Sequence, residues 1–222
     1  MSDLRLIVFD CDGTLVDSQH IIVAAMNMAF DQHKLPQPNA HEVRRVVGLS
    51  LLEAVARLLP GETEAHAPVA EAYKSAFGTL RRAGEIAEPL FPQTRETLLS
   101  LSEAGFLLGV ATGKSDRGLG ATLAHHELGD HFITLQTADR HPGKPHPSML
   151  EQAMREAGTE AANTLMVGDT AFDMEMAVNA GVHALGVGWG YHGPDELTAA
   201  GARDVLDSYA EFDRAIRALG WL

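Results

Sequence analysis

The sequence predicts a doubly wound α/β fold into which an all-helical unit is inserted. Short runs rich in aliphatic and β-branched residues alternate with amphipathic helical patterns, as in a parallel sheet covered by helices. The candidate strands are Leu6–Phe9, Leu107–Ala111, Ile133–Gln136, Thr164–Val167 and Ala184–Val187. A glycine stands between a helical pattern and the next strand at Gly105, Gly158 and Gly181, where the glycine that ends a helix is expected.

The helical insertion follows the first strand. About a hundred residues separate the first two candidate strands, far more than a βα crossover needs. From about Val16 to Ala87 the sequence has only helical periodicity. We therefore expect a core formed by residues 1–15 and 88–222 and a helical domain formed by residues 16–87. The turns at Val16-Asp17 and Glu88-Pro89 are candidate hinges.

Composition restricts the class of partner. The formal net charge of -13 disfavours binding to nucleic acid or to an anionic membrane, but it is compatible with a small anionic ligand held by a few placed cations. No leader peptide and no membrane span are expected, because no apolar run is long enough. The single cysteine, Cys11, cannot form an intrachain disulfide, which favours a reducing cytoplasm.

Two carboxylates follow the first strand, in Asp10-Cys11-Asp12-Gly13-Thr14. Ligands of open α/β sheets bind at the carboxyl ends of the strands. Alternate residues of an extended segment point the same way, so Asp10 and Asp12 can address one site. Cys11 then points to the opposite side, as a small buried apolar side chain. Asp12-Gly13 alone is equally typical of a turn.

Two more carboxylates, Asp169 and Asp173, follow the candidate strand Thr164–Val167. Carboxylate oxygens are the ligands that Mg²⁺ prefers, and Asp10 and Asp169 at neighbouring strand ends would supply them. The alternative is helix capping, with Asp169 or Thr170 at the N-cap and Asp173 in the first turn.

Two further segments offer groups that bind anions. Thr112-Gly113-Lys114-Ser115 ends the second strand and opens a helix, so it presents a hydroxyl and backbone N–H groups, although Ser115 alone is typical of an N-cap. Lys144 lies between Gly143 and Pro145 in a loop before a helix. It is a candidate catalytic cation, and a solvated surface lysine is the alternative.

Taken in order, these segments resemble the haloacid dehalogenase-like superfamily of hydrolases. The resemblance covers Phe9 to about Leu197 and consists of Asp10-x-Asp12-x-Thr14, Thr112, Lys144 and Gly168-Asp169-x-x-x-Asp173. The helical insertion resembles the C1 cap subclass. Asp173-Met174-x-Met176-Ala177-x-Asn179-Ala180-Gly181 and Gly186-Val187-x-Trp189-Gly190-Tyr191 resemble the phosphoglycolate phosphatase branch.

The resemblance implies a Rossmann-like core and a Mg²⁺-dependent phosphatase. Its substrate would be a small phosphorylated metabolite, phosphoglycolate-like or a sugar phosphate, hydrolysed through an aspartyl phosphate. The resemblance implies that Asp10 is the nucleophile and a metal ligand, and that Asp12 is the general acid and base and a metal ligand through its backbone carbonyl. It implies that Asp169 is a metal ligand and that Asp173 is a ligand or a support of the metal site. The implied phosphate-binding residues are Thr112, Gly113 and Lys144.

Some features leave substrate and assembly open. Gly113 stands where many phosphatases of this branch have Asn. Arg44 and Arg45 in the insertion are candidates for contacting the far end of a substrate, although adjacent arginines on a helix are also typical of solvated surface. Both a monomer and a homodimer are compatible with the sequence.

Alternative functions were weighed against the same residues. Dehalogenases of the superfamily lack the second aspartate, so Asp12 argues against that activity. Sugar phosphomutases carry a histidine ten residues after it, where this chain has Ile22, but the nearby His20 keeps a mutase open. A regulatory domain phosphorylated on aspartate, from a different class, would have little use for Asp12 or for the insertion. The spacing of the histidines matches no compact zinc motif, so they are expected on the solvated surface: His125, His126, His131, His141 and His146.

Overall fold

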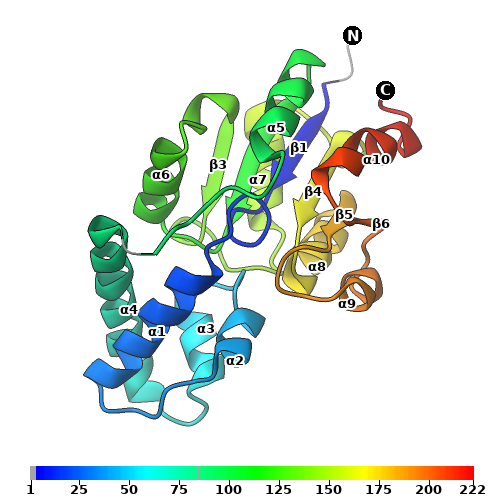
Figure 1. Ribbon diagram of the computed structural model, residues 1–222. Helices are drawn as coiled ribbons and strands as arrows, with labels where there is room; N and C mark the ends of the chain where they lie inside the picture. Colours follow the sequence, from blue (N-terminus) through cyan, green and yellow to red (C-terminus); the bar gives the residue numbers. More distant parts are fainter. Residues whose placement is uncertain (1–3, 85) are drawn as a thin grey trace.

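Six parallel strands form the central sheet of the computed structural model, which describes residues 4–84 and 86–222. The strands are β1 (Leu6–Phe9), β2 (Leu107–Thr112), β3 (Thr134–Thr137), β4 (Thr164–Gly168), β5 (His183–Val187) and β6 (Asp204–Leu206). Their order in the sheet is β3-β2-β1-β4-β5-β6 (Figure 1). The direction of winding reverses beside β1, and ligands bind at such a switch point in open α/β sheets.

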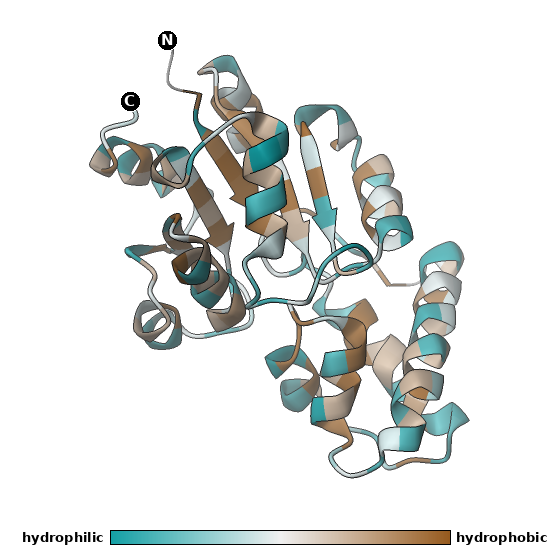
Figure 2. Cartoon of the chain, turned by 180° about the vertical axis from the view of Figure 1, so that it is seen from behind, coloured by the Kyte–Doolittle hydropathy of each residue, from teal (hydrophilic) through white to brown (hydrophobic). Residues whose placement is uncertain are grey.

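Helices cover both faces of the sheet. They are α5 (Thr94–Glu103), α6 (Asp116–His125), α7 (Ser148–Ala157), α8 (Ala171–Ala180), α9 (Pro194–Ala199) and α10 (Phe212–Ala218). Successive β1 side chains point to opposite faces. Ile7 and Phe9 pack in one apolar cluster with residues of α5, α6 and α10, whereas Leu6 and Val8 pack in another with residues of α7, α8 and α9. Figure 2 shows several strands of the sheet as mainly hydrophobic, whereas the helices alternate between hydrophobic and hydrophilic residues.

The predicted fold class is confirmed. All five predicted strands are present with small differences in their ends, and β3 begins at Thr134 rather than at Ile133. The sequence pattern missed β6. This edge strand has three residues, which is too short for a two-residue alternation to be recognised.

The chain between β1 and α5 forms four helices: α1 (Gln19–Gln32), α2 (Ala40–Arg45), α3 (Leu51–Leu58) and α4 (Thr63–Ala83). They share an apolar cluster that includes Met26, Phe30, Val55 and Val69. In Figure 1 these helices lie beyond the arrowheads of the strands, which mark their carboxyl ends.

The two segments that connect the four helices to the core lie side by side. Val16 forms an antiparallel bridge with Leu90. The Asp17 N–H donates to the Pro89 carbonyl at 2.8 Å, and the Phe91 N–H donates to the Leu15 carbonyl at 3.1 Å. The candidate hinge segments are therefore hydrogen-bonded to each other. Among the described residues, no helix has the length and apolar character that crossing a membrane would need.

Neighbouring leucines of α5 provide a test of the packing. Leu98 is fully buried in the cluster that covers one face of the sheet, whereas Leu99 is 42% exposed. Leu98→Ala should lower the free energy of unfolding by about 2–5 kcal/mol, because it removes buried methyl groups and leaves a cavity. Leu99→Ala should change it by less than about 0.5 kcal/mol. Urea unfolding followed by circular dichroism measures both, and equal losses would contradict this arrangement.

Candidate active site

Parallel pairing brings the acidic loops to one edge of the sheet. Phe9 of β1 is in register with Val110 of β2 and with Val167 of β4. The residues that follow these three strands therefore emerge at the same level. The Asp10 N–H donates to the Val167 carbonyl at 2.9 Å, which fixes the start of the β1 loop against β4.

A buried lysine joins two of the aspartates. Lys144, in the loop before α7, is fully buried. Its Nζ lies 2.8 Å from Asp10 Oδ1 and 2.6 Å from Asp173 Oδ1, as ion pairs rather than well-aligned hydrogen bonds. Burial alone would lower the pKa of Lys144, but the two carboxylates outweigh this effect and the net change is upward. The alternative of a solvated surface lysine is therefore wrong.

Asp169 and Asp173 are held by neighbouring polar groups. Asp169 Oδ1 accepts from the Thr14 hydroxyl at 2.9 Å, and its Oδ2 accepts from the Tyr191 N–H at 2.9 Å. Asp173 Oδ2 accepts from the Thr170 N–H at 3.0 Å and from the Thr170 hydroxyl at 2.7 Å. Thr170 and Asp173 form a capping box at the start of α8. Asp173 therefore caps the helix with one oxygen and faces Lys144 with the other.

Three buried carboxylates converge into a group that could hold a metal ion. One oxygen each from Asp10, Asp169 and Asp173 lies within 4.8 Å of the others. Asp10 Oδ2 is buried and accepts no hydrogen bond from any described residue. The donors are all carboxylate oxygens, which suit a hard divalent cation. These residues therefore fit a bound divalent metal.

The raised pKa values in this group of carboxylates favour the binding of a further positive charge. Burial raises the pKa of Asp10 to about 7, with Lys144 opposing this rise and Asp173 adding to it. Burial, followed by repulsion from Asp10 and Asp173, raises the pKa of Asp169. Lys144 pairs with two of the three carboxylates, and no other ion pair to this group is found among the described residues, so a divalent cation would offset the remaining repulsion.

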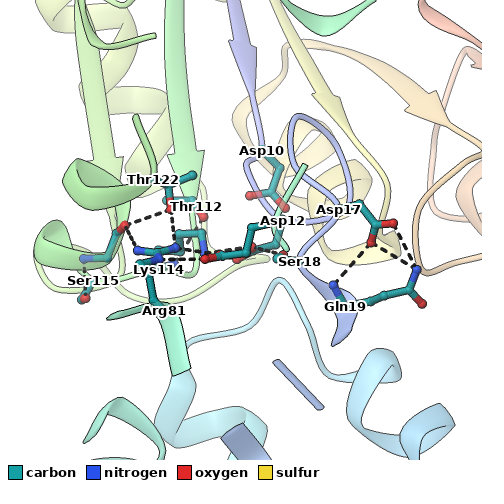
Figure 3. A network of polar contacts seen from close by, with 12 residues as sticks. Asp10, Asp12, Asp17, Ser18, Gln19, Arg81, Thr112, Lys114, Ser115 and Thr122 are labelled. Carbon is teal, nitrogen blue, oxygen red and sulfur yellow. Dashed lines mark hydrogen bonds and ion pairs between the residues drawn. The ribbon is translucent and has the colours of Figure 1, made fainter. Parts of the chain in front are cut away.

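Asp12 lies in a different environment from Asp10. Its Oδ1 accepts from the Ser18 hydroxyl and lies 2.8 Å from Lys114 Nζ. Figure 3 shows Asp12 between these two partners, with Arg81 and Thr122 beyond Lys114. Lys114 was not predicted to have a role from the sequence. Its position two residues after Thr112 was the available signal, because this places it in the same loop at the sheet edge.

The remaining phosphate-binding candidates line a cavity between the sheet edge and the four helices. Thr112 is buried, and its Oγ1 accepts from the Lys114 N–H at 3.3 Å. The cavity has a volume of about 1020 Å³. Its lining includes Asp10, Asp12, Thr112, Gly113, Lys114 and Ser115 from the core, Leu49 from the loop between α2 and α3, and Tyr73, Phe77 and Arg81 from α4.

Neither Arg44 nor Arg45 is brought to this cavity. Arg45 instead pairs with Glu196 of α9 at 2.6 Å, and both side chains are exposed. Arg81 of α4 lines the cavity. It could not be singled out by spacing, because nothing in the sequence marks which helical arginine faces the sheet.

Cys11 is not among the residues that line the cavity, whereas His141 is. Cys11 is fully buried in an apolar cluster, and burial raises the pKa of its thiol, which disfavours thiolate chemistry. Within the described ranges, no histidine belongs to a group that could hold a metal ion.

Comparison with known proteins identifies relatives across nearly the whole chain. "Probable phosphatase IndB" of Dickeya dadantii is 37% identical over 220 residues, which cover 96% of this chain and 94% of the relative. A phosphoglycolate phosphatase of Vibrio cholerae is 30% identical over 213 residues, covering 93% of this chain and 94% of the relative.

Solved structures share the fold. A haloacid dehalogenase-like family hydrolase from Streptococcus pneumoniae has a TM-score of 0.85 at 24% identity, covering 97% of this chain and all of that one (100%). A hydrolase from Pseudomonas syringae has a TM-score of 0.85 at 24% identity, covering 96% of this chain and 98% of that one.

A family model described as haloacid dehalogenase-like hydrolase matches residues 7–187, a span that contains Asp10, Asp12, Thr112, Lys144, Asp169 and Asp173. The similarity noted in the sequence is thereby confirmed, and the chain belongs to the haloacid dehalogenase-like hydrolase family.

Proposed function

We propose that this protein is a Mg²⁺-dependent phosphatase that hydrolyses a small phosphorylated metabolite through an aspartyl phosphate on Asp10. The observation that carries the proposal is the surroundings of Asp10. It is buried in a carboxylate cluster, paired with Lys144, and its Oδ2 accepts no hydrogen bond from a described residue. The phosphatase names of the relatives support the same reaction class.

In the first step, an Asp10 carboxylate oxygen attacks phosphorus and the bond from phosphorus to the leaving oxygen breaks. Asp12 gives a proton to that oxygen. In the second step, Asp12 takes a proton from water, the water oxygen attacks phosphorus, and the acyl phosphate bond breaks to release phosphate and regenerate Asp10. Lys144, the Thr112 hydroxyl and the Gly113 N–H bind the phosphoryl oxygens.

Asp10, Asp169 and Asp173 would hold the metal, together with the backbone carbonyl of Asp12. When bound, Mg²⁺ neutralises the repulsion between a carboxylate nucleophile and an anionic phosphoryl group. The chain's own contribution is to orient the carboxylates that would hold the metal. Thr14 and the Tyr191 N–H hold Asp169, and Thr170 holds Asp173.

Residues 16–87 would act as a cap over this site. Val46, Leu49 and Ala54 pack on Phe172 of α8 in a small apolar cluster that joins the insertion to the core. A Cβ added to Gly113 would lie 2.4 Å from the Leu49 carbonyl oxygen, so the loop between α2 and α3 rests directly on the phosphate-binding segment. A cap in this position would exclude water from the reacting group.

The substrate would be phosphoglycolate-like or a sugar phosphate. The phosphomutase alternative is less favoured, because Ile22 lines the cavity where mutases carry histidine, whereas His20 is exposed. The buried free Cys11 suits a reducing cytoplasm.

Replacing the nucleophile tests the covalent step. Asp10→Asn should retain the fold and lose at least about a hundredfold in kcat, a change of roughly 3 kcal/mol in the barrier, because an amide is a poor nucleophile. Asp213→Asn, on the exposed surface of α10, should have wild-type activity. Phosphate release and circular dichroism measure activity and folding. A folded Asp10→Asn variant with more than about a hundredth of the wild-type kcat would refute the nucleophile assignment.

Removing divalent ions tests the metal site. Exhaustive chelation should abolish turnover and Mg²⁺ should restore it, whereas Ca²⁺, which is larger and less strict in geometry, should bind without comparable turnover. Mg²⁺ should also raise the Tm of the wild type, because it binds the folded state. Asp169→Asn should reduce that rise. Full activity after chelation would exclude the proposed metal dependence.

Two glycine-to-alanine variants distinguish a steric effect on the cap from the general effect of an added methyl group. Gly113→Ala should lower kcat/KM about tenfold or more, because its Cβ would displace the loop that carries Leu49 and the lost alignment slows phosphoryl transfer. A Cβ at Gly120 of α6 would meet nothing within 4 Å, so Gly120→Ala should retain wild-type kcat/KM. Steady-state kinetics on both variants compares them. Wild-type kcat/KM in Gly113→Ala would mean that activity does not depend on the close contact between Gly113 and the loop that carries Leu49.

A further inference from the structure

Lys114 holds one oxygen of Asp12. Its side chain is 9% exposed, and its Nζ lies 2.8 Å from Asp12 Oδ1, the same oxygen that accepts from the Ser18 hydroxyl. The Lys114 backbone is also fixed, because its N–H donates to Thr112 Oγ1 and its carbonyl accepts from the Ala138 N–H at 3.2 Å. Lys114 therefore contacts Oδ1 from a hydrogen-bonded loop of the core, and Ser18 contacts it from the start of the insertion.

The other oxygen of Asp12 has no such partner. Among the described residues, no side chain or N–H donates to Asp12 Oδ2, and Asp12 lines the cavity. A carboxyl group can pass a proton along a defined direction only if its rotation is restrained. Anchoring Oδ1 leaves Oδ2 as the oxygen for proton transfer.

The cap contributes to holding Lys114. The Lys114 ammonium lies 5.2 Å from the centroid of the Phe77 ring on α4, a cation–π contact. The guanidinium of Arg81 lies 4.9 Å from the same ring. Arg81 in turn pairs with Glu88 at 2.7 Å and donates to Thr122 Oγ1 of α6 at 2.9 Å. These contacts fix the Phe77 ring over Lys114.

We infer that Lys114 is a positioning residue that aligns Asp12 for proton transfer to the leaving oxygen, and that Phe77 of the cap holds Lys114 in that position. This inference rests on the proposed function. In the step concerned, the bond from phosphorus to the leaving oxygen breaks, the electron pair stays on that oxygen, and the proton of Asp12 moves to it. Lys114 neither gives nor receives a proton.

Two aryl esters of similar shape test this role, because they differ in their need for an acid. Phenolate is a poor leaving group and needs a proton, whereas p-nitrophenolate leaves readily without one. Lys114→Met should lower kcat/KM for phenyl phosphate by about a hundredfold, the scale of general acid catalysis, and for p-nitrophenyl phosphate by less than about threefold. Lys114→Arg should recover much of the loss on phenyl phosphate. Phe77→Leu should show the same selective loss at smaller size.

Arg214→Met is the matched control. Arg214 also pairs with a carboxylate at 2.7 Å, that of Asp204, but its side chain is 56% exposed and it does not line the cavity. Its ratio of kcat/KM for the two esters should equal that of the wild type. Circular dichroism checks each fold, and Lys114→Gln replaces Lys114→Met if the latter does not fold.

Equal losses on both esters in Lys114→Met would overturn the inference, because Lys114 would then act on the phosphoryl group. An unchanged kcat/KM for phenyl phosphate would overturn it as well. Wild-type protein that releases phosphate from neither ester, with Mg²⁺ present, would refute the proposed function and this inference together.

Discussion

The buried ion pairs of Lys144 are the interaction on which the rest of the site depends. Three carboxylates cannot approach one another in the interior without a compensating charge, because each loses hydration and repels the others. Lys144 contacts two of them and comes from a loop outside the acidic segments. Removing one partner of such a buried pair typically costs about 3–5 kcal/mol. Lys144 therefore stabilises the arrangement of the buried carboxylates, and in the proposed function it would also bind the phosphoryl group.

Asp10 and Asp12 illustrate how neighbouring residues of one type acquire different chemistry. Asp10 faces Lys144 and two further carboxylates, an arrangement suited to a nucleophile that also binds a metal. Asp12 faces a hydroxyl and the ammonium of Lys114, next to the cavity and the cap. The residue between them, Cys11, packs into the apolar core. Two carboxylates two residues apart on an extended segment thus lie in different electrostatic environments.

Much of the core was predictable because its strands are buried and its acidic residues follow them directly. Parallel pairing then leaves only one place where Asp10, Thr112 and Asp169 can emerge. The contacts of the insertion were not predictable in the same way. Helical periodicity identifies a buried face, but it does not say which helix turns Phe77 and Arg81 toward the sheet or sends Arg45 to Glu196. Those contacts depend on the angle at which the insertion meets the core.

The pairing of Leu15–Asp17 with Pro89–Phe91 has a consequence for the folding and divergence of the chain. Because both ends of the insertion leave the core at one point, the distance between its two connections does not fix the length of chain between them. The entropy of closing such a loop grows slowly with its length. The insertion can therefore gain or lose residues at little cost to the stability of the sheet. Selection can reshape the part of the cavity that the insertion lines while the carboxylates at the sheet edge remain unchanged.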